Sequence, residues 1–243
     1  MKKRVIIDNR MRRIEKEQLK KLGHELIEIN TSAKVYSEIS SHVDIFACKV
    51  RDKIIIEPTQ YQNIMQSCIK SSIDIAENFI KGQDEVQEKY PDDIKYNVCT
   101  IGKKAIHNFQ YTDAKLKQEL INNNYELINT TQGYTNCSIA VIDDNSAIVS
   151  DKGLYKILKF HDIDTLLVEN NLDIKLLNGE NYSSKKGFIG GCITRLGDSI
   201  IVFGDLNKID IDGRIRDFIT SKNLKIIEFK GLDIIDYGGL IEI

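Results

Sequence analysis

The sequence of 243 residues has no tryptophan and only two prolines. It also has no apolar run near the roughly 18 residues that a membrane-spanning helix requires. Its longest apolar stretches, such as residues 139–142, have the length of a β-strand. Basic and acidic residues nearly balance, at 34 and 36, and they are interspersed, so the broad basic surface of a nucleic-acid-binding protein is missing. We therefore expect neither a membrane nor a nucleic acid as a partner.

The five cysteines form no CxxC pair, and no cluster of cysteine and histidine has the spacing of a zinc site. The sequence therefore predicts no bound metal and no cofactor. The basic N-terminus is interrupted by charged residues from Asp8 to Arg13 before an apolar segment of signal-peptide length can form. Free thiols and the missing signal together favour a reducing, cytoplasmic location. The sequence leaves the oligomeric state open.

What the sequence does contain is a short pattern that recurs about five times, and such repeats determine how a fold is interpreted. Each copy has small or polar leading residues, an apolar strand, a turn, a second apolar strand, an amphipathic helix and a closing strand. Four of the five cysteines occupy matching places in it. The clearest copies begin at residues 42–48, 96–99, 134–137 and 190–192. The order of elements predicts an α/β protein built from five ββαβ-type repeats.

Apolar periodicity and turn residues place the elements of these four copies. The predicted first and second strands are 45–50 and 54–56, 97–101 and 105–109, 138–142 and 147–149, and 193–196 and 200–203. The predicted helices are 61–79, 114–121, 154–160 and 215–219, and the closing strands are 125–128, 165–168 and 225–229. Residues 80–95 are polar and are interpreted as an irregular excursion.

The fifth copy is split between the two ends of the chain. Its parts are residues 234–243 for the first strand, 4–8 for the second, 12–22 for the helix and 24–29 for the closing strand. Ile14, Leu19 and Leu22 are predicted to form the buried side of this helix, and Gly23 to end it in a left-handed conformation. Pairing of the two ends would remove an open sheet edge. We therefore expect a single domain over residues 1–243, with the repeats closed into a pseudo-fivefold ring.

A ring of five ββαβ units whose leading residues face a central channel resembles the pentein fold, an α/β-propeller. That is the fold of guanidino-group-modifying enzymes such as arginine deiminase and agmatine deiminase. It is also the fold of the ribosome anti-association factors of archaea and eukaryotes, which are not enzymes. The stretch Gln132–Ser138 looks like an uncharacterised bacterial branch of the fold.

One motif carries a sharper resemblance. His42-Val43-Asp44 is similar to the His-x-Asp of agmatine deiminase, in which the histidine is the general acid/base and the carboxylate binds the guanidinium. In that family the nucleophilic cysteine follows two repeats later, which implies Cys137 here. The residues before Cys137 lack the double glycine of the family, whereas Gly190-Gly191 directly precedes Cys192. Cys192 is therefore a second candidate nucleophile, although it lies three repeats after His42.

Two functions remain open from these residues. In the first, Cys137, His42 and Asp44 supply the thiolate, imidazole and carboxylate of a cysteine-dependent hydrolase or transferase, deiminase-like or amidinotransferase-like, that acts on a small guanidino or amidino compound. This predicts a depressed pKa for the Cys137 thiol. In the second, the protein is a non-catalytic pentein that binds a ribosome, another protein or a small ligand. The thiols and His42 are then structural, as is expected for Cys48, Cys68, Cys99 and His107.

Overall fold

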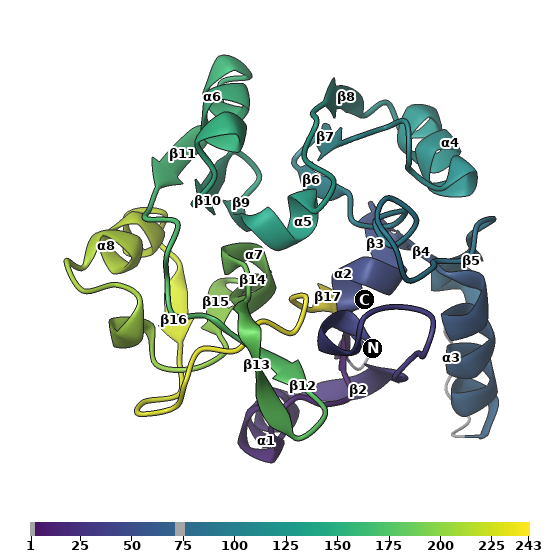
Figure 1. Cartoon of the computed structure of the whole chain (residues 1–243), viewed down its shortest axis with the longest axis horizontal. Coiled ribbons are helices and arrows are strands. Elements are labelled where there is room, and N and C mark those ends of the chain that lie inside the picture. The colour runs from purple at the N-terminus through teal and green to yellow at the C-terminus, as the bar shows by residue number, and fades with distance from the viewer. Residues whose placement is uncertain (1–2, 71–75) are drawn as a thin grey trace.

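The computed structural model describes residues 3–70 and 76–243, and in these residues it contains five three-stranded sheets with one shared topology (Figure 1). In each sheet the first strand is antiparallel to the central strand, and the third strand is parallel to it. The sheets are β17-β1-β2 (Ile241–Glu242, Lys3–Asp8, His24–Ile29), β3-β4-β5 (Ala47–Val50, Lys53–Ile56, Phe79–Lys81), β6-β7-β8 (Cys99–Ile101, Lys104–His107, Glu126–Asn129), β9-β10-β11 (Ile139–Asp143, Ser146–Val149, Asp164–Leu167) and β14-β15-β16 (Ile193–Leu196, Ser199–Val202, Lys225–Ile227).

One helix connects the central strand of each sheet to its parallel third strand, as a parallel pair requires. These helices are α1 (Arg13–Lys21), α3 (Pro58–Lys70), α4 (Ala114–Asn122), α6 (Lys152–Phe160) and α8 (Arg214–Ser221). Short 3-10 turns lie at η1 (Ser37–Ile39), η2 (Ala76–Asn78) and η3 (Leu206–Lys208). Asp113 caps α4, because its Oδ1 accepts a hydrogen bond from the Leu116 amide at 2.8 Å. Gly23 follows α1 with φ +90°, as predicted.

The two ends of the chain lie side by side. Val5 and Ile6 of β1 pair with Glu242 and Ile241 of β17, so the last strand completes the sheet that the first strand begins. The predicted strand over residues 234–243 is much shorter than expected, however. Gly238 and Gly239 have φ values of +68° and +71° and turn the chain before β17.

Two of the leading segments differ from the prediction, and a third, which precedes the strand that begins at Ile193 as predicted, takes the same form. They form single helical turns, α2 (Val43–Phe46), α5 (Thr135–Ser138) and α7 (Ile189–Cys192), where strands were expected to begin at Ile45 and Ser138. In α2 the amides of Val43 and Asp44 donate to the carbonyls of Tyr237 and Gly238, at 3.4 and 3.3 Å. These partners come from the C-terminal loop rather than from a neighbouring strand, which is why local alternation did not reveal the turn.

Other predictions need correction. Residues 79–81 form β5, which pairs in parallel with residues 54–56, so the irregular excursion begins later than expected. The part of the predicted helix 61–79 that covers residues 71–75 lies outside the described residues. A hairpin of β12 (Lys175–Asn178) and β13 (Asn181–Lys186) was not predicted, because β13 is polar and exposed.

The buried side of α1 was also predicted wrongly in part. Leu19 is buried, but Ile14 and Leu22 are 54% and 40% exposed. Glu15 is buried instead, where its carboxylate accepts hydrogen bonds from Arg12 and from the Tyr237 hydroxyl. The charged Glu15 is buried because a residue of a distant loop supplies one of its hydrogen bonds. The buried side of α1 therefore differs from the apolar side that was expected.

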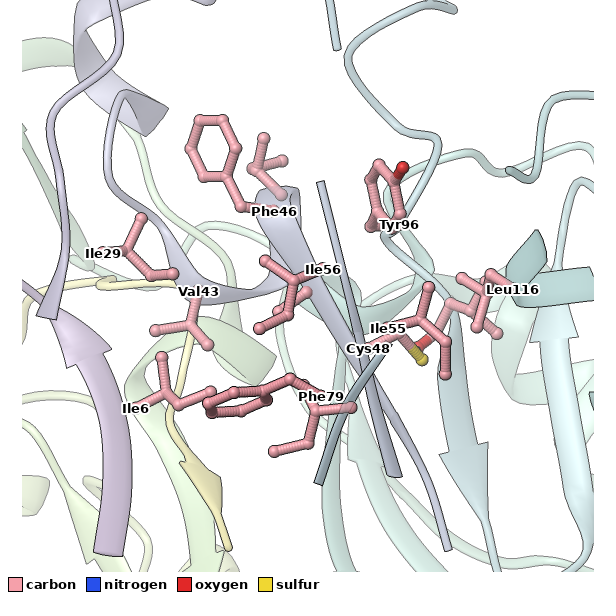
Figure 2. Close-up of a cluster of buried hydrophobic side chains, with 14 of the residues drawn as sticks. Ile6, Ile29, Val43, Phe46, Cys48, Ile55, Ile56, Phe79, Tyr96 and Leu116 are labelled. Carbon is pink, nitrogen blue, oxygen red and sulfur yellow. The ribbon is translucent and has the colours of Figure 1, made fainter. Parts of the chain in front are cut away.

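The turn α2 is held in place by a hydrophobic cluster to which its own side chains belong (Figure 2). Val43 and Phe46 of α2 pack in one cluster with Ile6 of β1, Ile56 of β4 and Phe79 of β5. All five side chains are at most 5% exposed. Full burial of a side chain of this size contributes roughly 1.5–3 kcal/mol, so the position of α2 is strongly determined. Within residues 3–70 and 76–243, no helix combines the length and apolar character that crossing a membrane requires.

Candidate functional site

Polar side chains from three leading segments and the C-terminal loop meet where the short turns α2, α5 and α7 come together (Figure 1). His42 immediately precedes α2 and Asp44 lies in it, Asn97 precedes β6, Cys137 lies in α5, and Asp236 belongs to the loop before β17. All five side chains are buried. The structure therefore brings Cys137 and Asp44 together as the sequence predicted, and it adds Asn97 and Asp236.

Asn97 and Asp44 hold the Cys137 thiol. Its Sγ donates to Asp44 Oδ2 at 2.9 Å and accepts a hydrogen bond from Asn97 Nδ2 at 3.1 Å. The Oδ1 of Asn97 accepts the backbone amides of Asn136 at 2.9 Å and Cys137 at 3.3 Å. Asn97 thus fixes both the backbone of α5 and the sulfur, which makes it a positioning residue for the thiol.

His42 lies against a different carboxylate. Its Nδ1 is 3.7 Å from Asp236 Oδ1, a distance at which charges interact but no hydrogen bond forms. Among the described residues, neither ring nitrogen of His42 has a hydrogen-bond partner, and neither does Asp44 Oδ1. The imidazole and the thiol are therefore not hydrogen-bonded to each other. Buried polar atoms without a partner are rare in folded proteins and call for a functional explanation.

Burial dominates the electrostatics of this cluster. It raises the pKa of the Asp44 and Asp236 carboxyls and lowers the pKa of the His42 imidazole, although the nearby Asp236 and Asp8 partly oppose the change at His42. Burial, and then the charges of Asp44 and Asp236, raise the pKa of the Cys137 thiol well above its ordinary value. The sequence-based expectation of a depressed thiol pKa thus differs from the structure, in which Cys137 is a protonated donor.

Glycines allow the segments to approach this closely. A Cβ at Gly191 would lie 1.7 Å from Asp236 Oδ1, and one at Gly190 would lie 2.2 Å from the backbone oxygen of Asn136. A Cβ at Gly238 would lie 2.5 Å from Asp44 Oδ1. Gly190 and Gly191 therefore permit a close approach of α7 to α5 and to the loop that carries Asp236.

The remaining candidates are held differently. Cys192 is buried in α7, its Sγ lies 3.4 Å from the carbonyl oxygen of Ile189, and burial raises the pKa of its thiol well above the ordinary value. His107 contacts Thr112 Oγ1 through Nδ1 at 2.6 Å and the Gly133 carbonyl through Nε2 at 3.0 Å. Cys48, Cys68 and Cys99 are buried among apolar side chains. Among residues 3–70 and 76–243, no group of three or more His, Cys, Asp or Glu side chains is arranged to hold a metal ion.

Sequence reasoning missed Asp236 and Asn97. The only signal for Asp236 is its place directly before Tyr237-Gly238-Gly239, a stretch noted for its double glycine and not for its carboxylate. Asn97 lies two residues before its strand, as Cys137 does in the next copy, so comparison of the leading residues between repeats could have found it.

Comparisons with known proteins agree with this fold. Residues 6–241 match the Family of unknown function (DUF6873), and a search of curated proteins finds no match. DDAH from Pseudomonas aeruginosa, in a mutant complexed with citrulline, superposes with a TM-score of 0.58 over 96% of this chain and 92% of its own, at 10% identity. An inosamine-phosphate amidinotransferase from Streptomyces griseus has a TM-score of 0.54 over 93% and 75%, at 11% identity. An amidinotransferase of the saxitoxin pathway from Microseira wollei has 0.52 over 91% and 73%, at 11% identity. All are pentein proteins, which confirms the resemblance found in the sequence.

Proposed function

The chain belongs to the family of unknown function DUF6873 and has the fold of the pentein superfamily, and from this premise we propose that it is a cysteine-dependent hydrolase or transferase acting on a small guanidino or amidino compound. Cys137 would be the nucleophile, His42 the general acid/base and Asp44 the carboxylate that binds the cation. Asp236 joins them as a second carboxylate. The superposed DDAH structure holds citrulline, and the other two relatives are amidinotransferases.

The observation that carries the proposal is the group of unpartnered atoms beside the thiol. Asp44 Oδ1 and both ring nitrogens of His42 are buried without hydrogen-bond partners among the described residues, and Asp44 Oδ2 contacts Cys137 Sγ. Asp236 lies near both His42 and Cys137. A planar cation with several N–H donors would donate to Asp44 Oδ1 and to the unprotonated ring nitrogen of His42, and it would offset the two carboxylates.

The same cation would activate the thiol. The charges of Asp44 and Asp236 raise the pKa of Cys137, so a guanidinium that pairs with them removes that effect and favours the thiolate. The thiol proton passes to His42, a sulfur–carbon bond forms at the guanidinium carbon, and the carbon–nitrogen bond to the leaving amine breaks as His42 returns the proton. Water, or an acceptor amine in a transferase, then displaces the sulfur.

We also propose that the repeats form one closed pentein domain with pseudo-fivefold order. The support is the shared topology of the five sheets and the pairing of β1 with β17. Closure places the leading residues of the copies around one axis, as the proposed site requires.

A second candidate, binding of a cation without turnover, is favoured by the burial of the thiol. Cys137 is 2% exposed and its pKa is raised rather than depressed. A thiol of this kind reacts slowly unless a ligand changes its surroundings.

The experiment offers L-arginine, agmatine and guanidinoacetate to the full chain and measures release of ammonia or amine, together with the mass of the intact protein. We expect release from at least one compound, a covalent adduct on Cys137, and loss of release by at least about a hundredfold in Cys137→Ser. The matched control is Cys192→Ser, another buried thiol in a leading turn, which should retain release. Binding by calorimetry without release, unchanged in Cys137→Ser, would overturn catalysis in favour of the second candidate.

A further inference from the structure

A second compartment lies on the axis that the five sheets share. It is a cavity of about 420 Å³, and the first strands β3, β6, β9, β14 and β17 all contribute to its lining. Asn136 also lines it, and the Nδ2 of that residue lies 3.5 Å from Asp44 Oδ2. Cys137, His42 and Asp44 are not among the lining residues. Asn136 thus forms a wall between this cavity and the thiol cluster.

Two side chains of opposite charge line this cavity, and their hydrogen-bond partners are backbone atoms. Lys49 Nζ donates to the backbone oxygen of Glu242 at 2.5 Å, and Glu242 Oε2 accepts the Gly197 amide at 3.2 Å. Among the residues that the structure describes, neither side chain forms an ion pair with another side chain. Burial lowers the pKa of the Lys49 ammonium, with Glu242 and Asp52 opposing the change. A partly buried charge without an oppositely charged group in direct contact is a costly arrangement, and a charged ligand would relieve it.

The rest of the lining is neutral overall. Arg195 and Asp144, which also line the cavity, pair with each other at 3.2 Å. Thr100 and Thr194 contribute hydroxyls, and the apolar wall includes Val98, Ile139 and Leu240. The surface offered to a ligand is therefore one cation, one anion, two hydroxyls and an aliphatic wall.

We propose that the cavity is a binding site for a small zwitterion with an aliphatic side chain, that is, for an α-amino acid. The carboxylate of the ligand pairs with Lys49, its ammonium pairs with Glu242, and its side chain packs against the apolar wall. A simple anion would leave Glu242 without a direct ion-pair contact, and a simple amine would leave Lys49 without one. The volume lies within the roughly 300–1,000 Å³ typical of small-molecule sites.

Calorimetry with three probes of one carbon skeleton tests the charges. L-leucine carries both charged groups, 4-methylpentanoate lacks the ammonium, and 3-methylbutylamine lacks the carboxylate. Each charged hydrogen bond lost corresponds to about a tenfold loss of affinity or more, so leucine should bind at least about tenfold tighter than either analogue. Equal affinities for the three probes, or no binding of leucine at millimolar concentration, would overturn the proposal.

Single substitutions test whether the ligand binds in this cavity. Lys49→Met and Glu242→Gln should each weaken leucine binding by about tenfold or more. The matched control is Lys53→Met. Lys53 lies on the adjacent strand β4, its Nζ donates to the Glu77 carbonyl at 2.7 Å and lies 3.7 Å from Asp52 Oδ2, and it does not line the cavity. Thermal melting of each variant confirms that it is folded. If Lys49→Met binds leucine as tightly as Lys53→Met does, the cavity is not the site.

Discussion

The Cys137 thiol donates a hydrogen bond to Asp44 at 2.9 Å, between residues 93 positions apart in the chain. This contact joins the helical turns α2 and α5, and Asn97 supports it from a third repeat. It also places a carboxylate beside the sulfur, which holds the proton on the thiol. The Cys137 thiol is therefore protonated when no ligand is bound. Any nucleophilic chemistry at Cys137 depends on a group that compensates the negative charge of Asp44.

Replacement of Asp44 by Asn tests that dependence. The substitution removes a negative charge and an acceptor, so the pKa of the Cys137 thiol should fall, while burial still keeps it above its ordinary value. The rate at which iodoacetamide alkylates Cys137, followed by mass spectrometry as a function of pH, should rise severalfold at a given alkaline pH. Asp52→Asn, in the exposed turn between β3 and β4, is the matched control. Identical pH profiles for Asp44→Asn and wild type would show that the carboxylate does not govern the thiol.

His107 should make the stability of the protein depend on pH. Burial lowers the pKa of its imidazole to about 4, from 6.5 in an unperturbed state. Because the folded state favours the neutral ring, the contribution of His107 is fully present above pH 6.5 and is lost as the pH falls towards 4. The loss amounts to about 3 kcal/mol of unfolding free energy.

The measurement is urea unfolding at several pH values between 4 and 7. In His107→Gln, which retains a donor and an acceptor, the decline of stability with falling pH should be smaller than in wild type. His161→Gln serves as the control, since His161 is partly exposed beside Glu126. A His107→Gln variant that loses stability on acidification as steeply as wild type would contradict the assignment.

Gly190 should tolerate no side chain. A Cβ there would lie 2.2 to 2.6 Å from the backbone oxygens of Asn136, Cys137 and Ile139, and backbone atoms cannot move aside as a side-chain end can. We expect Gly190→Ala to lower the free energy of unfolding by about 1–3 kcal/mol or more, measured by chemical denaturation. Gly153→Ala in α6 is the control, because its Cβ would meet only the Asp151 carboxylate at 3.0 Å. Equal stability of the two variants would mean that α5 and α7 separate easily.

Much of the architecture follows from local pattern. The strand predicted at 24–29 coincides with β2, and the helix predicted at 114–121 ends one residue before α4 does. Alternation and helical period depend on neighbouring residues, so they could be read directly. The turns α2, α5 and α7 could not be, because their short segments are shaped by contacts with other repeats and with the C-terminal loop.

The residues of the candidate site were also predictable only in part. Cys137 and Asp44 were found because a resemblance of motif and repeat order pointed to them, and the structure places them in contact. Asp236 was not found, since nothing near it in the chain marks it as a neighbour of His42. A low thiol pKa was expected only from the catalytic hypothesis, whereas burial and a carboxylate raise it.

Short-range periodicity and composition are enough to reveal the number and order of the repeating units and the residue types available for chemistry. Which of those residues meet, which protonation state their surroundings favour, and how the chain ends pair emerge in the folded molecule alone. Desolvation and Coulomb interactions depend on distances between segments that are remote in the chain, and no local pattern encodes those distances.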